Sequence, residues 1–513
     1  MNWTRRQFLA TGALAAAGAS LGGCAASPKE VLMNPSQGAA SAPVSDYFAS
    51  KFGITRDVID RVLGRALSRG GDWGELFFEH TRRGTVALLD GKVTQAYSGV
   101  ELGMGVRCVC GEQAGYGYSE SFLPEDLLAA ADAAAAIAPG VRASDIRRRE
   151  SLEFKRYYDL AIDWDALDVT RAVSLLQTID AKARAKDPEI IQVQVTISWQ
   201  QRTTMVNTSD GIDAFDNKPY YSLRMNTVIK HGEEIQSNGS NFADLDSFEA
   251  ITPERVEAMI DEAIADTRIL FEAVKPKGGE WPVVLGAGAS GILLHEAIGH
   301  GLEADFNRKE ASIFATKMNQ RVASDEVTIY DSGLFEKSRG ALNVDDEGTP
   351  GQKTVLVENG VLRNYLHDKI SARFYGVAPT GNGRRESYKF YPKPRMRVTC
   401  MDNGTHEFEE LIRGIKYGVY CRTFTNGQVY IGPGDYTFYV KNGFLIEDGK
   451  ITAPIKDVNI IGNGPDTLSK ITMVANDFQR HKGGWTCGKD GQSVPVSLGM
   501  PSVLVSSITV GGH

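Results

Sequence analysis

The chain is poor in the features that mark several classes of protein. It has 6 cysteines in 513 residues, too few for a disulfide framework to hold so long a chain together. Acidic residues outnumber basic ones by 64 to 56, and the formal net charge of −8 argues against a nucleic-acid partner. No internal repeat is visible, and the apolar run 10–23 is too short and too mild to span a bilayer. The remaining composition, 42% hydrophobic and 23% charged, predicts a globular protein of two or three domains.

The first 45 residues have the pattern of an export signal and a tether. Arg5 and Arg6 precede a mildly apolar stretch that ends in Leu21-Gly22-Gly23-Cys24, which resembles a lipobox. Residues 1–24 are therefore predicted to be a twin-arginine signal, with lipid attached at Cys24, and residues 25–45 a flexible linker. The expected location is the periplasm or cell envelope, with the protein held on a membrane by its lipid. The alternative is a disordered N-terminus with a chance arginine pair.

Two domains are expected after the tether, which makes the fold class α+β. Residues 46–275 mix helices and strands, whereas residues 276–513 show short apolar-polar alternation broken by Gly, Asn and Pro, which predicts a β-rich domain. The boundary is placed at Pro276-Lys277-Gly278-Gly279. Helices are expected at 123–137, 168–186, 252–274, 290–300 and 406–416. Strands are expected at 72–80, 84–89, 190–198, 202–207, 222–229, 354–359, 361–366, 428–431, 437–440 and 503–510.

Four cysteines have no assigned role. Cys108 and Cys110 lie two apart on an expected strand, an arrangement that disfavours a bond between them. Cys400 and Cys421 are free to pair or not, and the sequence leaves their state open.

The chemically distinctive segment is His295-Glu296-Ala297-Ile298-Gly299-His300. Imidazole is a common zinc ligand, and a neighbouring carboxylate is suited to act as a general base. The two histidines are five residues apart, which places them about 140° apart around an ideal helix, too far to share a metal. A π-type bulge or an early helix end at Gly299 brings them together. Taken alone, the spacing is equally compatible with two histidines that bind nothing.

A catalytic zinc site needs a third protein ligand, and three candidates stand open. Glu303 and Asp305 are near in sequence, and Cys487 lies in a glycine-rich segment predicted to be a loop. A lone cysteine is also a small buried hydrophobe in many proteins. Chain-local reasoning does not choose among the three.

A competing motif, the GxGxxG spacing of Gly286 to Gly291, precedes the histidine segment. It is the dinucleotide fingerprint in form, with Asp305 roughly 20 residues further on. That fold requires a second parallel strand ending at the acidic residue, and residues 300–304 lack such a pattern. The glycines are better explained as a tight strand-to-helix turn.

Several long segments together resemble the TldD/PmbA family, and its TldD branch in particular. They are Leu293 to Arg308, Thr380 to Tyr388, Pro394-Arg395-Met396, Thr486 to Gln492 and Ile508 to Gly512. The likeness extends from about residue 48 to the end and is strongest after residue 280. The motifs are long and keep their order, which makes the match specific.

The resemblance implies a zinc-dependent peptidase with one Zn²⁺ per chain. Carried over residue by residue, the metal ligands are His295, His300 and Cys487, and Glu296 is the general base. It further implies an unfolded peptide as substrate, a PmbA-type subunit or a second copy as partner, and a mixed α/β domain followed by a β-rich domain that holds the site. Familiar members are cytoplasmic, so the export signal is a departure.

Four residues receive secondary roles. Glu303 and Asp305 are expected either to support a ligand histidine or to be solvated turn carboxylates. Arg384 and Arg385 are candidates to bind a substrate carboxylate or an oxyanion, with a solvated loop as the alternative. The alternative function for the whole chain is a non-catalytic peptide-binding lipoprotein with structural zinc.

Overall fold

The computed structural model describes residues 46–138, 140, 145–148 and 150–512. The expected signal, Cys24 and the tether lie outside these residues. Within the described part of the chain, no helix is both long enough and apolar enough to cross a membrane.

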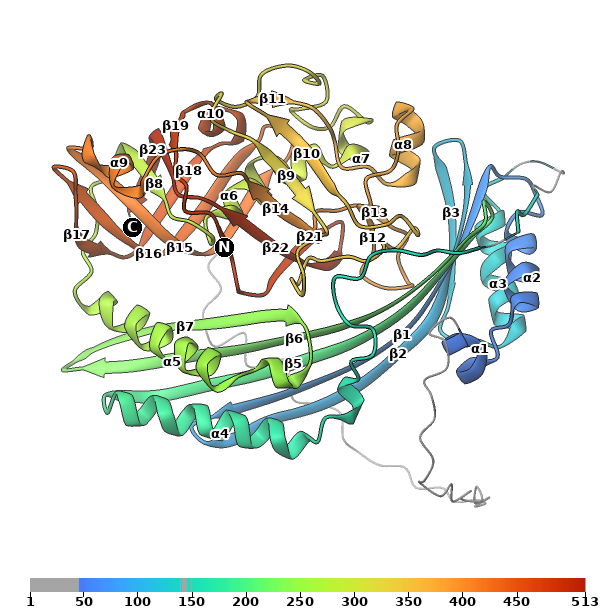
Figure 1. Ribbon diagram of the computed structural model, residues 1–513, viewed down its shortest axis with the longest axis horizontal. Helices are drawn as coiled ribbons and strands as arrows, with labels where there is room; N and C mark the ends of the chain where they lie inside the picture. Colours follow the sequence, from blue (N-terminus) through green and yellow to red (C-terminus); the bar gives the residue numbers. More distant parts are fainter. Residues whose placement is uncertain (1–45, 139, 141–144, 149, 513) are drawn as a thin grey trace, which may run out of the picture. The chain divides into compact units, whose positions relative to one another are not determined.

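A sheet of unusually long strands forms the N-terminal half (Figure 1). Its order is β3-β2-β1-β5-β6-β4, with β7 also paired to β6, and every pairing except β4 with β6 is antiparallel. The strands are β1 (Trp73–Leu89), β2 (Lys92–Cys110), β3 (Gln113–Ser119), β4 (Glu150–Ser151), β5 (Ile190–Thr208), β6 (Ile212–His231) and β7 (Glu234–Leu245). The two strands expected at 190–198 and 202–207 are one strand, and so are those expected at 72–80 and 84–89. The residues between the expected strands also belong to β1 and β5, because Arg82 of β1 pairs with Gln201 of β5 and the sheet continues through both.

Helices cover this sheet where their apolar residues recur at helical spacing. In α4 (Val169–Lys186) the residues Ala172, Leu176, Ile179 and Ala183 are buried against the strands, and Asp168 caps the helix by accepting a hydrogen bond from the Thr170 N–H at 2.9 Å. The others are α1 (Tyr47–Phe52), α2 (Arg56–Ala66), α3 (Pro124–Ala135) and α5 (Pro253–Arg268). The helix expected at 252–274 is shorter than predicted, since α5 ends at Arg268 and a 3₁₀ turn, η4 (Ile269–Phe271), follows.

The C-terminal half is rich in strands, as the sequence predicts, and contains two seven-stranded sheets. One has the order β11-β10-β9-β14-β22-β20, with β21 paired to β22. In the other, β15 also pairs with β16, which closes the path β15-β8-β23-β18-β16 on itself. The first sheet comprises β9 (Ile329–Ser332), β10 (Lys353–Glu358), β11 (Val361–Leu362), β14 (Val398–Met401), β20 (Gln479–Arg480), β21 (Trp485–Lys489) and β22 (Gln492–Met500). The second comprises β8 (Gly279–Leu285), β15 (Tyr417–Tyr430), β16 (Asp435–Glu447), β17 (Lys450–Ile455), β18 (Val458–Asn463), β19 (Ile471–Val474) and β23 (Val503–Gly512).

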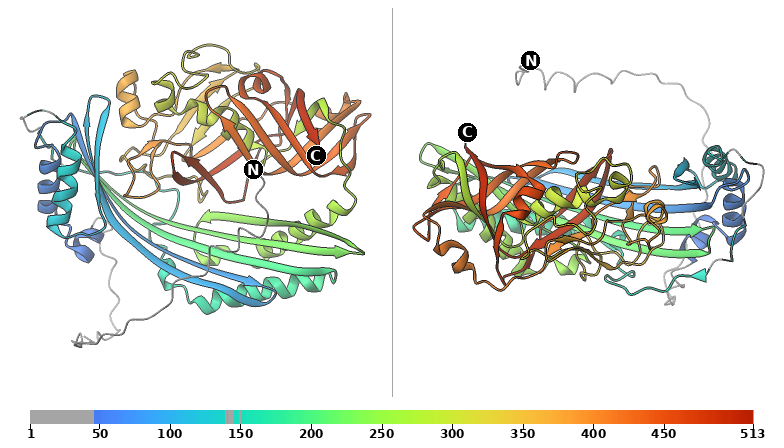
Figure 2. Two further views of the ribbon diagram at one scale, coloured as in Figure 1. Left: turned by 180° about the vertical axis from the view of Figure 1, so that it is seen from behind. Right: turned by 90° about the horizontal axis from the view of Figure 1, so that it is seen from above.

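Short helices and a two-stranded ribbon complete this half, which Figure 2 shows from behind and from above in yellow-green to red. They are α6 (Gly291–Leu294), η5 (His295–Gly299), η6 (His300–Leu302), α7 (Ala304–Asn307), α8 (Lys369–Tyr375), α9 (Phe408–Arg413), α10 (Gly464–Ser469), β12 (Gly383–Arg384) and β13 (Lys393–Pro394). A single large apolar cluster packs both sheets against α6 and η5, which buries Leu293, Ala297 and Ile298. The fold is thus the mixed α and β class that the sequence predicts.

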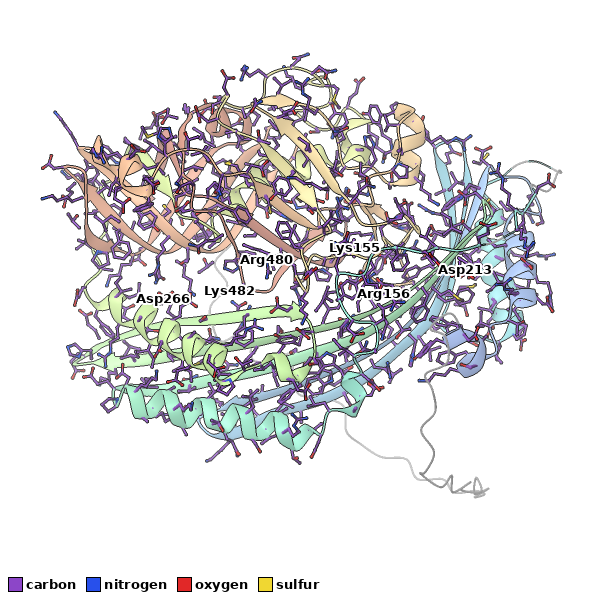
Figure 3. All side chains as sticks on the ribbon, viewed as in Figure 1. Lys155, Arg156, Asp213, Asp266, Arg480 and Lys482 are labelled. Atoms are coloured by element: carbon purple, nitrogen blue, oxygen red, sulfur yellow. The ribbon has the colours of Figure 1, made fainter. Side chains whose placement is uncertain are left out.

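Buried ion pairs join the two halves. Arg107 of β2 contacts Glu75 of β1 at 2.7 Å and Glu347 of the C-terminal half at 2.5 Å, with all three side chains fully buried. Arg385 pairs with the other carboxylate oxygen of Glu75, its Oε1. A third pair joins the buried Asp266, labelled in Figure 3, to Arg422, whose side chain is partly exposed. A buried charge without a partner is costly, so these pairs fix how the two halves fit together.

Candidate metal centre

The histidine segment begins directly after a strand that ends in a glycine turn. Strand β8 leads through Gly286 to Ser290 into α6, and Gly288 adopts a positive φ of 77°. Asp305 lies at the start of α7 and is not preceded by a parallel strand, since residues His300–Leu302 form a 3₁₀ turn. The glycines therefore serve a strand-to-helix turn, and the nucleotide-binding alternative lacks its second strand.

The helix changes its winding at the two histidines. Residues His295–Gly299 form a π-helical turn and His300–Leu302 a 3₁₀ turn. The π turn brings the two rings together, with centroids 4.9 Å apart and planes at 84°. The break predicted near Gly299 from the five-residue spacing is confirmed.

Gly299 is needed at this break because the backbone lies close to Met396. A Cβ atom at position 299 would stand 2.1 Å from the Met396 Sδ and 3.2 Å from the Leu294 carbonyl oxygen. We expect Gly299→Ala to destabilise the fold by about 1–3 kcal/mol, as overpacking does, and to lower zinc binding. Chemical denaturation and metal analysis measure both effects. The control is Gly414→Ala after α9, where nothing lies within 4 Å of the new Cβ; equal results for the two variants would contradict this account.

Cys487 completes the cluster from another part of the chain. It lies on β21, opposite Val494 of β22, in a hairpin whose turn residues Asp490 and Gly491 both have positive φ. The expectation that it lies in a loop is wrong, because the glycines around it belong to a strand and its turn. Its Sγ is 3.5 Å from the His300 Nε2 across 187 residues of sequence. The ligand atoms of His295, His300 and Cys487 all lie within 4.8 Å of one another, and all three residues are buried.

Charge distribution at the cluster favours the form of Cys487 that binds a metal. Burial alone raises the pKa of Cys487, but the charges of His295 and His300 outweigh it, and the pKa lies well below the usual thiol value. A thiolate is the form of cysteine that binds a metal. Burial lowers the pKa of His300, but the negative charges of Glu303 and Cys487 raise it by more. The net pKa of His300 is therefore well above the usual value for histidine. The pocket therefore stabilises a charge pair between an imidazolium and the thiolate, and the ring of His300 gives up its proton when it binds a metal.

These residues fit a zinc ion. Zn–N and Zn–S bonds of about 2.0 and 2.3 Å at a tetrahedral angle place the two ligand atoms about 3.5 Å apart, which matches the separation of Cys487 and His300. The buried Nδ1 of His295 has no hydrogen-bond partner among the described residues. Two imidazoles and one thiolate are a donor set that suits zinc.

Glu296 lies inside the π turn, between the two histidines in sequence, and is partly buried. Burial raises the pKa of its carboxyl group, while the nearby charges of His295 and His300 act to lower it. Its carboxylate is thus within electrostatic reach of the cluster.

The two acidic residues expected near the site have different surroundings. Glu303 is fully buried, and its Oε2 lies 3.0 Å from the Nδ1 of His300, so the solvated alternative is wrong for it. Burial raises the pKa of Glu303, but Lys489 and His300 outweigh this and hold the pKa at about 2. Asp305 contacts neither histidine in the described contacts; it accepts a hydrogen bond from the Lys489 Nζ at 2.7 Å.

Both candidate arginines are buried, which contradicts the alternative of a solvated loop. Arg384 donates hydrogen bonds to the carbonyl oxygens of Met396 and Pro495, at 2.5 and 2.7 Å. The guanidinium of Arg385 is engaged by Glu75 and by the carbonyl oxygen of Asp346. The structure thus places both in the packing around the ribbon β12–β13 rather than at the ligand cluster.

Sequence reasoning missed Lys489 and Arg395, which bracket Glu303. Lys489 lies 3.1 Å from Glu303, and the Nε of Arg395 lies 3.8 Å from it. Both residues lie in motifs that carried the family resemblance, but neither motif assigned them a role. The available signal was strand alternation, which puts Lys489 on the same face of β21 as Cys487.

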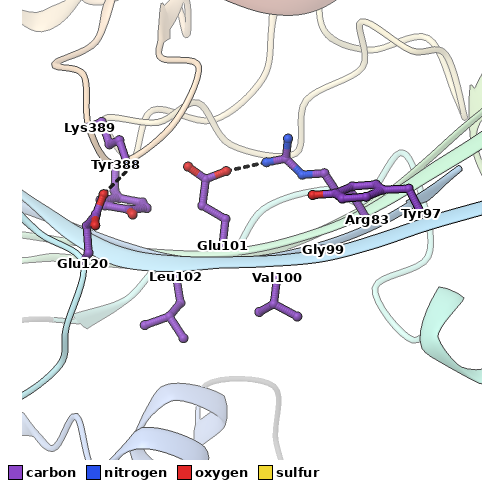
Figure 4. Close-up of a pocket in the computed structure, with 9 residues that line it drawn as sticks. All are labelled: Arg83, Tyr97, Gly99, Val100, Glu101, Leu102, Glu120, Tyr388 and Lys389. Carbon is purple, nitrogen blue, oxygen red and sulfur yellow. Dashed lines mark hydrogen bonds and ion pairs between the residues drawn. The ribbon is translucent and has the colours of Figure 1, made fainter. Parts of the chain in front are cut away.

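Two hollows in the described surface are candidates for a substrate site. One, of about 600 Å³, is lined by Ser237 to Asn241 of β7 and by Gly484, Trp485 and Thr486, which directly precede Cys487. The other, of about 410 Å³, lies along β2 (Figure 4), and its charges are paired, Arg83 with Glu101 and Lys389 with Glu120. None of the residues lining either hollow belongs to the metal cluster.

The five cysteines among the described residues, Cys108, Cys110, Cys400, Cys421 and Cys487, are all free thiols. The expectation of no bond between Cys108 and Cys110 agrees with this. The open question for Cys400 and Cys421 is answered in the same way.

Comparisons with known proteins agree over most of the chain. Residues 74–138, 162–270 and 278–512 match the PmbA/TldA metallopeptidase domain 1, central domain and C-terminal domain. A metalloprotease TldD homolog of Haemophilus influenzae is 37% identical over 478 residues, covering 91% of this chain and 99% of the relative. A zinc metalloprotease TldD homolog of Saccharolobus solfataricus is 36% identical over 239 residues, which cover 46% of this chain and 53% of the relative.

A solved structure shares the fold. TldE from Thermococcus kodakarensis superposes with a TM-score of 0.69 at 19% identity, covering 89% of this chain and all of that one. Sequence and fold thus lead to one conclusion: the chain belongs to the TldD/PmbA family of metallopeptidases.

Proposed function

We propose that this protein is a zinc peptidase that hydrolyses amide bonds in unfolded peptides or small unstructured proteins. The observation that carries the proposal is the convergence of His295, His300 and Cys487 on one buried point, with Glu296 between the two histidines. One Zn²⁺ per chain is expected there. The relative from Saccharolobus solfataricus is named a zinc metalloprotease, which supports the choice of metal.

The protein side of the reaction follows from the positions of these residues. Zinc bound by the two imidazoles and the thiolate supplies a Lewis acid for the scissile carbonyl and lowers the pKa of water. Glu296 takes a proton from the attacking water and passes it to the nitrogen of the leaving amine. Burial raises the pKa of its carboxyl group towards neutral pH, which suits a group that first accepts a proton and then donates it. Glu303 orients the ring of His300 through its Nδ1.

The number of ligands favours catalysis over a purely structural metal. Structural zinc sites are closed by four protein ligands, whereas catalytic sites keep one position open. Among the residues that the structure describes, the group has three members. The non-catalytic peptide-binding lipoprotein is therefore the weaker alternative.

One hollow supports a peptide substrate. It runs from β7 to Trp485 and Thr486, which precede the ligand Cys487 in the chain, and its walls carry both polar side chains and Trp485. An extended chain offers its carbonyl and N–H groups to such a wall. We propose that a PmbA-type subunit or a second copy encloses the bound peptide; the TldE structure, which shares the fold, supports the choice of partner.

The test of the metal site is the loss of Cys487. We expect Cys487→Ala to lose most of its zinc on dialysis against a chelator and to cleave no member of a peptide library, because two imidazoles alone bind zinc weakly. Cys421→Ala, which removes an equally buried thiol outside the cluster, is expected to keep its zinc and activity. Metal analysis with a peptide-library digest measures both. Full zinc content in Cys487→Ala would contradict the ligand assignment.

We further propose export by the twin-arginine route and lipid attachment at Cys24 in the cell envelope. The supporting feature is the order of the arginine pair, the apolar run and the Leu21-Gly22-Gly23-Cys24 box. Mass spectrometry of the membrane-extracted protein is expected to find a lipidated N-terminal cysteine. An unprocessed Met1 in a soluble fraction would overturn it.

A further inference from the structure

Lys489 is buried beside the metal cluster without belonging to it. On β21, the side chains of Cys487 and Lys489 lie on one face because they are two residues apart, and both are buried while Thr486 and Gly488 are exposed. Lysine is almost never fully buried unless it is paired. A buried ammonium at this position therefore indicates a specific arrangement of partners.

The partners of Lys489 come from the segment that carries His300. Its Nζ lies 3.1 Å from the Glu303 Oε2 and 2.7 Å from the Asp305 Oδ1, and it donates a further hydrogen bond to the Pro394 carbonyl oxygen at 3.2 Å. The Lys489 side chain is 2% exposed and that of Glu303 is 0% exposed, so solvent does not screen their attraction.

Arg395 makes a second link between the same two segments. Its Nη2 donates to the carbonyl oxygen of Cys487 at 2.6 Å, and its Nη1 donates to that of Gln492 at 3.4 Å, which holds both strands of the hairpin. Its Nε lies 3.8 Å from the Glu303 Oε1. Arg395 is itself fully buried.

Glu303 is the residue on which these links meet. One of its oxygens is shared by the His300 Nδ1 and the Lys489 Nζ, at 3.0 and 3.1 Å. A displacement of Glu303 would turn the ring of His300, and the Nε2 of that ring is the atom that lies 3.5 Å from the Cys487 Sγ. The hairpin that carries Cys487 is thus tied, through Lys489 and Glu303, to the ring of the second ligand.

We propose that Lys489 is a positioning residue for the metal: acting through Glu303, and assisted by Arg395, it holds His300 and Cys487 at ligand distance. The inference rests on the proposed zinc site. Residues behind a ligand histidine typically change metal affinity by 10–100-fold when they are removed. Lys489 is expected to have an effect of that size although it does not touch the metal.

The test measures zinc affinity by competition with a chelator on the purified protein. Lys489→Met keeps the length of the side chain and removes its charge, and it is expected to weaken zinc binding about 10–100-fold. Lys489→Arg is expected to restore most of the affinity. The matched control is Lys393→Met, since Lys393 pairs with Asp490 of the same hairpin at 2.5 Å and does not touch Glu303 in the described contacts; it is expected to bind zinc as the wild type does.

A spectroscopic readout separates positioning from a general loss of stability. With Co²⁺ in place of zinc, the thiolate-to-metal band and the visible bands report the arrangement of Cys487 and His300. Lys489→Met is expected to shift both sets of bands, and Lys393→Met to leave them unchanged. If Lys489→Met does not fold, Glu303→Gln, which keeps the shape and weakens the attraction to Lys489, is expected to show the same shift.

The outcomes separate this inference from the proposed function. Wild-type zinc affinity and cobalt spectrum in Lys489→Met, or in Glu303→Gln if the former does not fold, would overturn the positioning role and leave the zinc peptidase intact. A wild-type protein that binds neither zinc nor cobalt at one per chain would overturn the proposed function itself. If the two residues act as one unit, Lys489→Met is expected to have a large effect in the wild-type protein and little further effect in a Glu303→Gln background.

Discussion

Glu296→Gln is expected to keep about one zinc per chain and to lower kcat for peptide hydrolysis by about 10²–10⁴-fold. The amide has the shape of the carboxyl group but accepts no proton, so the attacking water and the leaving amine lose their proton carrier. Zinc is retained because Glu296 is not among the three residues whose ligand atoms converge. Metal analysis and steady-state kinetics on one preparation measure both quantities.

The matched control is Glu326→Gln, an exposed glutamate outside the cluster, which is expected to leave kcat unchanged. If Glu296→Gln retains its zinc and hydrolyses peptides at the wild-type rate, the general-base assignment is wrong. If wild type and variant both bind zinc and neither hydrolyses any peptide, the non-catalytic binding protein becomes the better account.

Arg385→Met is expected to lower the free energy of unfolding by about 3–5 kcal/mol, the range for breaking one partner out of a buried ion pair. Arg385 and Glu75 are both fully buried, and the change leaves the carboxylate of Glu75 with Arg107 as its remaining cation. The same change removes the hydrogen bond to the Asp346 carbonyl oxygen and the contact with the Phe77 ring, whose centroid is 4.2 Å away. Chemical denaturation followed by circular dichroism measures the effect.

An exposed arginine supplies the comparison for this variant. Arg363 pairs with Glu358 at 3.1 Å with 43% of its side chain exposed, and Arg363→Met is expected to cost less than about 1 kcal/mol. A role of Arg385 in substrate binding predicts a different pattern, namely unchanged stability with a raised KM. That pattern would show that the structural explanation given for Arg385 is wrong.

The local part of the site follows from the sequence, because the helix geometry is a local property. The five-position spacing of His295 and His300 requires a change of winding, and Gly299 marks where it occurs; the π turn is the result. The helix α4 is predictable for the same reason, since its capping Asp168 and its apolar spacing lie within one segment.

The remaining ligand does not follow from local patterns. Cys487 lies in the local hairpin β21–β22, and this hairpin is placed by the pairing of β22 with β14, a long-range pairing that leaves no trace in nearby residues. Local patterns left Cys487 as one of three candidates, and only the resemblance to the family selected it. The closure of the second C-terminal sheet by the pairing of β15 with β16 was not predicted either.

Buried charge is the other feature that the sequence concealed. Adjacent arginines such as Arg384 and Arg385 are usually solvated, and their burial depends on acceptors from remote strands, such as Glu75 and the carbonyl oxygen of Pro495. Lys489 was overlooked for the same reason, because its partners Glu303 and Asp305 lie 184 or more residues away in the chain. Charges of this kind become interpretable once their partners are known.

X-ray absorption spectroscopy of the protein loaded with one equivalent of zinc tests the central claim most directly. Two imidazoles, one thiolate and one open position predict a first shell with one sulfur at about 2.3 Å and the remaining nitrogen or oxygen atoms at about 2.0–2.1 Å. The sulfur contribution is expected to disappear in Cys487→Ala and to persist in Glu296→Gln. A first shell without sulfur in the wild type, or one closed by four protein ligands, would contradict the account.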